Sequence, residues 1–80
     1  MQSVYVGDLD LTVNEQFLQD HFKKKYMSVT GAKIISDPTT KISRGYGFVH
    51  FANHEESLKA ITEMNGTFIK GKPAKVSSSF

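Results

Sequence analysis

The segment SRGYGFVHF, from Ser43 to Phe51, restricts the possible folds of this 80-residue sequence more than any other. Its apolar and aromatic residues fit a β-strand, in which alternate side chains point to opposite faces. The two faces would then be Gly47, Val49 and Phe51 on one side, and Tyr46, Phe48 and His50 on the other. Both faces carry apolar groups, as in a strand covered on both sides. A chain this short has few other elements with which to cover them.

The composition fits one small domain and excludes several kinds of chemistry. Of the 80 residues, 39% are hydrophobic and 11% aromatic, enough for a core. There is no cysteine, so disulfides, cysteine-based zinc sites and thiol chemistry are excluded, and a reducing compartment is compatible. No apolar run approaches the ~20 residues that a membrane-spanning helix needs. The formal net charge of +2 is too small to indicate a partner unless the cations gather on one face.

Periodicity and capping residues predict the first half of the chain. VYVGDL, residues 4–9, alternates as a strand does. Thr12 with Glu15 three residues later predicts a capping box for an amphipathic helix that ends at residue 25 or 26. AKIIS, residues 32–36, is expected to be the second strand. DPTTKIS is a turn that leads to the third strand, residues 45–51.

The second half of the chain repeats the helix–strand order. Asn53 with Glu56 predicts the cap of a second helix, which Asn65-Gly66 would end. Phe68–Ile69 is expected to form a small turn or short strand, and PAKVS, residues 73–77, the last strand. The resulting order β-α-β-β-α-β predicts an α+β, ferredoxin-like fold: a four-stranded antiparallel sheet with two helices on one face.

Two helices can cover only one face of that sheet, so the opposite face should stay open. If the first and third strands are neighbours, Tyr5, Tyr46 and Phe48 form one exposed aromatic cluster on it. Aromatic rings beside cations suit single-stranded nucleic acid, because every base has a face that can stack. Four further residues share this face and are candidate phosphate or base contacts: Lys33, His50, Lys75 and Ser77.

Two segments resemble the motifs of a known family. VYVGDL is similar to the six-residue RNP motif of RNA recognition motif (RRM) domains, and RGYGFVHF matches the eight-residue RNP motif. The resemblance covers essentially the whole chain. It implies that Tyr5, Tyr46 and Phe48 stack on bases or pack against sugars of single-stranded RNA. It also implies that Arg44 pairs with a phosphate.

The sequence departs from the usual family pattern at two positions. Asp8 stands where asparagine is most common, and could accept a hydrogen bond from a base. Lys41 stands where glycine is usual, and adds a charge near the bound strand. The segment FKKKYMSVTGAKII, together with VGDL, resembles the middle RRMs of TIA-like, yeast U1-associated and tRNA-selenocysteine-associated RNA-binding proteins.

The resemblance also implies a setting for the domain. We expect residues 1–80 to be a single monomeric RRM from a longer multi-domain protein, with neighbouring RRMs in the same chain. Uridine-rich RNA is the expected target, and mRNA processing, splicing or other RNA metabolism the expected role. The expected location is the nucleus, the cytoplasm or both, without a membrane partner, cofactor or metal ion.

Two other classes of function stay in view. An RRM-like domain can bind protein through a helix face, and Phe17, outside the main apolar stripe of the first helix, is a possible anchor. Catalysis is not expected, because the sequence offers no cysteine, no metal-ligand spacing and no Walker-type phosphate loop. Its one G-x-G lies inside a predicted strand. Binding without catalysis is therefore the predicted activity.

Overall fold

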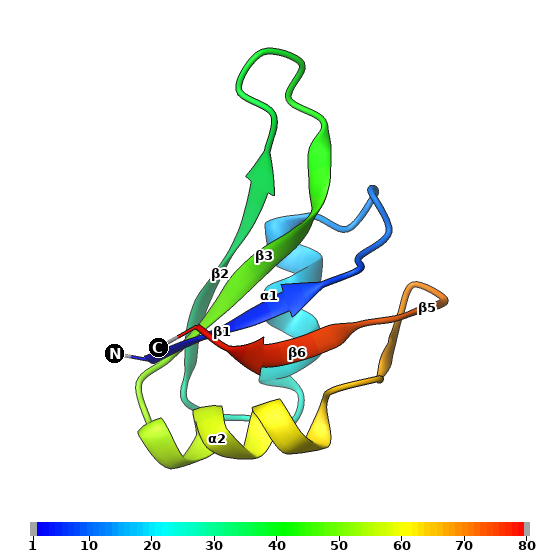
Figure 1. Cartoon of the computed structure of the whole chain (residues 1–80). Helices are drawn as coiled ribbons and strands as arrows, with labels where there is room; N and C mark the ends of the chain where they lie inside the picture. Colours follow the sequence, from blue (N-terminus) through cyan, green and yellow to red (C-terminus); the bar gives the residue numbers. More distant parts are fainter. Residues whose placement is uncertain (1, 80) are drawn as a thin grey trace.

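The computed structural model describes residues 2–79. Strands β1 (Gln2–Gly7), β2 (Val29–Ser36), β3 (Ser43–Phe51) and β6 (Lys75–Ser78) form an antiparallel sheet in the order β2-β3-β1-β6 (Figure 1). Helices α1 (Glu15–Lys23) and α2 (His54–Glu63) connect them. The predicted α+β ferredoxin-like fold is confirmed, with β1 and β3 as the two central strands.

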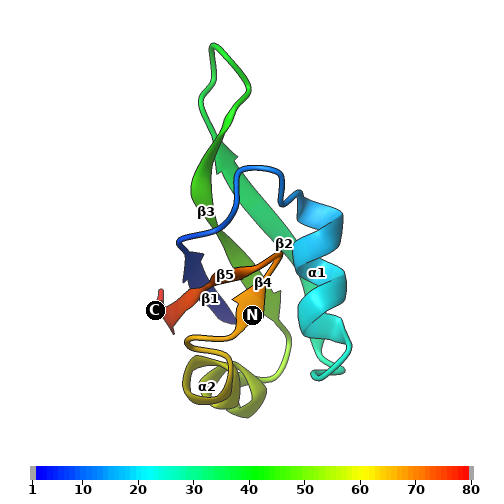
Figure 2. The same cartoon turned by 90° about the vertical axis from the view of Figure 1, so that its right-hand side faces the viewer.

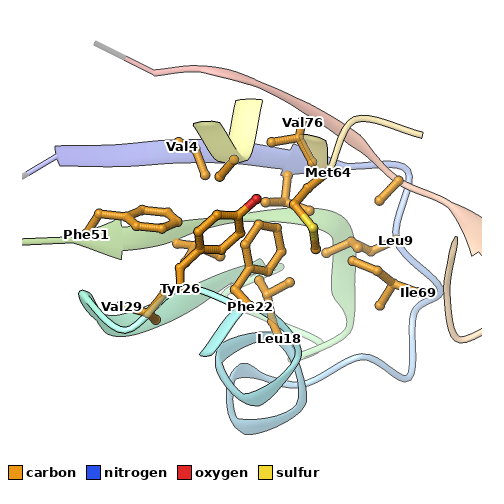
Figure 3. Packing of buried hydrophobic residues seen from close by; sticks show 14 of the residues in the cluster. Val4, Leu9, Leu18, Phe22, Tyr26, Val29, Phe51, Met64, Ile69 and Val76 are labelled. Carbon is orange, nitrogen blue, oxygen red and sulfur yellow. The ribbon is translucent and has the colours of Figure 1, made fainter. Parts of the chain in front are cut away.

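Both helices pack on the same face of the sheet and enclose the core. Leu18 and Phe22 of α1 are buried against inward-facing residues of the strands (Figure 3). Ala60 of α2 is buried in the same cluster. The rings of Phe22 and Tyr26 both make edge contacts with Phe51. The sheet residues of this core are Val4, Val6, Val29, Val49, Phe51 and Val76. All of them except Val29, which lies outside the predicted second strand, are on the face that alternation predicted.

The N-terminal cap of α1 differs from the prediction. Asn14 is the cap, and its side-chain oxygen accepts a hydrogen bond from the Phe17 N–H at 2.8 Å. Thr12 instead donates its N–H and hydroxyl to the Asp10 carboxylate, which lowers the Asp10 pKa. The predicted Thr12–Glu15 capping box is therefore wrong: asparagine is at least as good a cap as threonine. Glu15 accepts from the Ile34 N–H instead.

The cap of α2 agrees with the prediction. The Asn53 side chain accepts from the Glu56 N–H at 2.9 Å. The Glu56 carboxylate does not complete a capping box, because it accepts from the Ser28 N–H and so joins the helix to the turn before β2. Gly66, just after the helix, has a φ of +87°, which glycine adopts without strain.

Several elements begin or end at other residues than expected. α1 ends at Lys23, β2 begins at Val29 rather than at residue 32, and β6 begins at Lys75 rather than at residue 73. Phe68–Ile69 is the short strand β4, which pairs with β5 (Lys72–Pro73) in a separate hairpin (Figure 2). Pro73 therefore lies in this hairpin and outside the main sheet. No helix among residues 2–79 is long and apolar enough to cross a membrane.

Candidate nucleic-acid interface

One row of side chains crosses all four strands on the face away from the helices. The strand register pairs Phe48 with Lys33 on one side and with Tyr5 on the other, and pairs Tyr5 with Ser77. Partners in antiparallel strands point to the same face. The row therefore runs Lys33, Phe48, Tyr5, Ser77, with two aromatic rings in the centre and a cation at one edge.

Tyr5, Tyr46 and Phe48 form a cluster in which each ring contacts the other two. Ring centroids are 5.8 Å apart for Tyr5–Tyr46, 6.1 Å for Tyr5–Phe48 and 6.4 Å for Tyr46–Phe48. Phe48 meets both tyrosines edge-on, whereas the tyrosines are tilted by only 33°. All three side chains are only half-buried. We refer to these three residues as the aromatic cluster.

The remaining predicted residues of this face surround the aromatic cluster. His50 is half-buried, two residues beyond Phe48, and pairs with Ser3 and Gly31. Lys75 is exposed and pairs with Gly7, at the end of β1. The structure thus brings Lys33, His50, Lys75 and Ser77 to the face on which the sequence placed them.

Arg44 lies at a break in the alternation of β3. The register jumps from Ile35–Tyr46 to Ser36–Ser43, which leaves Arg44 and Gly45 as extra residues in a bulge. Gly45 has a φ of +80°, and its carbonyl accepts a hydrogen bond from the Leu9 N–H at 2.8 Å. The Arg44 guanidinium lies 3.4 Å from the Asp37 carboxylate, in an exposed ion pair.

Asp37 also organises the loop between β2 and β3. Its Oδ1 accepts hydrogen bonds from the N–H groups of Thr39 and Thr40. Hydrogen bonds from Thr40 and Thr39 hold the Asp37 pKa below its usual value of 3.8. The carboxylate that pairs with Arg44 is therefore charged at neutral pH.

Lys41 and Asp8 both adopt left-handed backbone conformations. Their φ angles are 66° and 58°, and both side chains are exposed. The left-handed region is unstrained for glycine and tolerated by asparagine and aspartate. This explains why glycine is usual at the position of Lys41, and why aspartate can stand in for asparagine at position 8.

Two features of this face were not predicted from the sequence. One is the Asp37–Arg44 ion pair, which spans the loop between β2 and β3. No periodic pattern in the sequence indicates which residues of a loop pair with each other. The other is Gly7, which is buried although no helix covers it, because the Tyr5 ring lies over it. A glycine two residues after a surface tyrosine in a strand is the only signal, and it is a weak one.

A cleft of about 310 Å³ lies apart from the aromatic cluster, between residues 11–15 and the ends of β2 and β3. Lys41 lines it, and none of the three rings does. Within residues 2–79, no group of three or more His, Cys, Asp or Glu side chains is arranged to hold a metal ion.

The chain is similar to curated RNA-binding proteins. It is 44% identical over 77 residues to polyadenylate-binding protein RBP47B′ of Arabidopsis thaliana, covering 96% of this chain and 18% of that protein. It is 45% identical over 74 residues to protein NAM8 of Saccharomyces cerevisiae, covering 92% of this chain and 14% of that protein. The chain therefore spans less than a fifth of the length of these relatives.

Solved structures show the same fold over the whole chain. The second RRM domain of the yeast poly(U)-binding protein Pub1 superposes with a TM-score of 0.90 and 29% identity, covering 100% of this chain and 95% of that one. The Rna15 RRM with bound RNA (GU) superposes with a TM-score of 0.81 and 28% identity, covering 96% of this chain and 81% of that one.

The family model for the RNA recognition motif matches residues 4–75, which include both RNP-like segments and all three residues of the aromatic cluster. Together with the register, the open face and the relatives, this match shows that the chain belongs to the RNA recognition motif family.

Proposed function

We propose that this domain binds single-stranded RNA across the open face of its sheet. The observation that carries the proposal is the aromatic cluster: three large rings in mutual contact, partly exposed to solvent, on a face that no helix covers. Apolar surface left exposed in this way is available to a partner. Bases supply flat apolar surfaces of matching size, and each stacked base contributes roughly 1–3 kcal/mol.

The row of side chains across the sheet suggests how a bound RNA strand would lie. Bases stack on the cluster, while Lys33 at one edge and Lys75 at the other are placed for phosphates or base edges. Ser77, next to Tyr5, can donate or accept a hydrogen bond to a base. His50 lies further along the same face, and Asp8 and Lys41 lie at the end where the strands meet the loops.

Arg44 needs to exchange partners to contact a phosphate. In the unbound domain its guanidinium faces Asp37 at 3.4 Å, a long and exposed pair. Exposed ion pairs contribute little to stability because water and salt screen them. A phosphate can offer a shorter, bidentate, charge-assisted contact. We therefore assign Arg44 to the RNA backbone, with Asp37 holding it in place until RNA arrives.

The relatives support RNA as the class of ligand, but their names do not agree on one preferred base. Poly(U)-binding, polyadenylate-binding and a bound GU segment all occur among the names of similar proteins. We propose uridine-rich RNA as the preferred target. A sheet of four strands reads few bases, so tight recognition would need neighbouring RRMs acting through avidity. The proposed role is non-catalytic, in mRNA processing, splicing or related RNA metabolism, in the nucleus or cytoplasm.

Fluorescence anisotropy with labelled oligouridine, oligoadenosine and duplex RNA tests this proposal. We expect both single strands to bind better than the duplex, and oligouridine to bind best. Phe48→Ala and Tyr46→Ala should each weaken binding by roughly 1–3 kcal/mol while the domain stays folded by circular dichroism. If a folded Tyr46→Ala/Phe48→Ala double variant bound as tightly as the wild type, the stacking mechanism would be wrong.

A second candidate function is protein binding through α1. The Phe17 ring is partly exposed, stacks with His21 at 6.4 Å, and has the Lys70 ammonium 4.9 Å from its centroid. Lys70 lies in the turn between β4 and β5 (Figure 2). This surface is therefore formed by α1 and a hairpin that is far from it in the sequence. It is distinct from the aromatic cluster, and binding there would not depend on Phe48.

A further inference from the structure

Gly7 lies on the open face, two residues after Tyr5 in β1, and its surroundings are unusual for an open position. It is buried, and the three atoms nearest to a Cβ added there all belong to the Tyr5 side chain. An added Cβ would collide with the Tyr5 hydroxyl and lie only 2.6 Å from Cζ and 2.7 Å from Cε2. The Tyr5 phenol therefore occupies the space above Gly7.

The backbone itself does not require glycine at this position. The glycines with positive φ are Gly45, Gly66 and Gly71, and Gly7 is not among them. An alanine could adopt the extended conformation of β1, and in a strand it would cost less conformational entropy than glycine does. The reason for glycine here is thus the space that it leaves for the Tyr5 ring.

That space sets the orientation of Tyr5 within the aromatic cluster. By leaning over Gly7, the ring runs along β1 and comes to 5.8 Å from Tyr46, tilted by only 33°. A ring pushed off Gly7 would have to change its rotamer, since side-chain torsions fall into separate staggered wells. It would then lose its near-parallel arrangement with Tyr46.

We propose that Gly7 is a positioning residue for RNA binding. Because Gly7 has no side chain, the Tyr5 ring has room to lie flat on the sheet, where a base can stack on it. This inference rests on the proposed function of the aromatic cluster. It assigns a role to a residue that has no side chain to contact a base, and it predicts that one added methyl group weakens RNA binding while changing stability little.

The central variant is Gly7→Ala. We expect oligouridine affinity to fall toward the level of Tyr5→Ala, a loss of about 5- to 150-fold if one stacked base is lost. Thermal stability should change little, because the advantage of alanine over glycine in a strand offsets the lost contact between the Tyr5 and Tyr46 rings. The matched control is Gly31→Ala in β2, where an added Cβ meets nothing within 4 Å; its affinity should not change.

Two further measurements separate this inference from the proposed function. In the RNA-free domain, nuclear Overhauser contacts between the Tyr5 and Tyr46 rings should disappear in Gly7→Ala and persist in Gly31→Ala. In a double-variant cycle, Gly7→Ala should have no further effect on affinity once Tyr5→Ala has removed the ring.

Each outcome is decisive for one of the two ideas. If Tyr5→Ala weakens binding but Gly7→Ala keeps both affinity and the Tyr5–Tyr46 contacts, the positioning role is wrong and the proposed function stands. If Gly7→Ala lowers stability as much as affinity, its role is structural and the inference is overturned. If Tyr5→Ala, Tyr46→Ala and Phe48→Ala all leave affinity unchanged, the proposed function fails first.

Discussion

At the scale of single residues, the aromatic cluster combines mutual contact between its rings with exposure of those rings to solvent. Its rings contact one another, which contributes roughly 0.5–1.5 kcal/mol for each pair beyond simple burial. They also remain partly exposed to solvent, which leaves apolar surface that the fold does not bury. A bound base would cover that surface without displacing any protein group. The cluster is therefore organised before RNA arrives.

The ion pair of Arg44 with Asp37 leads to a prediction about salt. Arg44→Ala should weaken RNA binding and reduce the dependence of log Kd on log salt concentration by about 0.7–1, the effect of one phosphate contact. Asp37→Asn removes the competing carboxylate while the amide oxygen can still accept from the loop N–H groups. Affinity should then rise, most clearly at low salt.

Anisotropy titrations over a range of salt concentrations measure both effects. Lys59→Ala is a suitable control, since Lys59 lies exposed on α2, the helix side of the domain. An unchanged salt slope in Arg44→Ala would show that this side chain makes no phosphate contact.

At the scale of elements, α1 is held at its start by Asn14. Val13, just before the cap, and Leu18, four positions into the helix, are both buried in the same cluster. This is the arrangement of a hydrophobic staple, which fixes the direction in which the chain enters the helix. The start of α1 in turn positions the Glu15 carboxylate on the Ile34 N–H of β2.

The corrected cap gives a direct comparison of two variants. Asn14→Ala should destabilise the domain by about 1 kcal/mol, because the Phe17 N–H loses its acceptor. Thr12→Ala should cost less, since its hydrogen bonds are to an exposed aspartate in the preceding loop. Urea denaturation of both variants measures the difference. A larger loss for Thr12→Ala would restore the capping box that the sequence suggested.

The elements also show how far the sequence can lead. Alternation placed Tyr5, Tyr46 and Phe48 on one face because a strand of period two leaves no other choice. The same reasoning could not place Arg44, because the bulge at Gly45 depends on a tertiary hydrogen bond from Leu9. The cap of α1 was misplaced because two good capping residues lie two positions apart, and local rules do not rank them.

Gly7 shows a limit of another kind. By alternation along β1, Gly7 shares the face of Tyr5, yet its role depends on the rotamer of Tyr5. A rotamer follows from all the neighbours of a side chain, including those on other strands. No pattern within β1 contains that information.

At the scale of the whole molecule, Tyr26 joins the two helices at one end of the core. Its ring packs on Phe51, and its hydroxyl donates to the Glu63 carboxylate at 2.7 Å. Burial, followed by the Glu63 contact, raises the Tyr26 pKa well above 10.0. The hydrogen bond from Tyr26, followed by the charge of Lys25, holds the Glu63 pKa below 4.5.

This pair makes stability depend on pH in a defined direction. A lowered Glu63 pKa contributes stability that is present above pH 4.5 and is lost as pH falls through the lower folded value. We expect Glu63→Gln to be less stable than wild type at neutral pH and equally stable in acid. Tyr26→Phe should reduce the same acid sensitivity. Urea denaturation at several pH values tests this; parallel pH profiles for all three proteins would contradict it.

The central claim is that RNA lies on the open face of the sheet, and chemical-shift mapping during an oligouridine titration tests it most directly. The account predicts that the largest shifts occur in the rings of Tyr5, Tyr46 and Phe48 and in the amides of β1 and β3, with smaller shifts at Lys33 and Ser77. It predicts that Phe17 and the rest of α1 stay unchanged. Shifts confined to Phe17, His21 and Lys70, with the aromatic cluster silent, would contradict it.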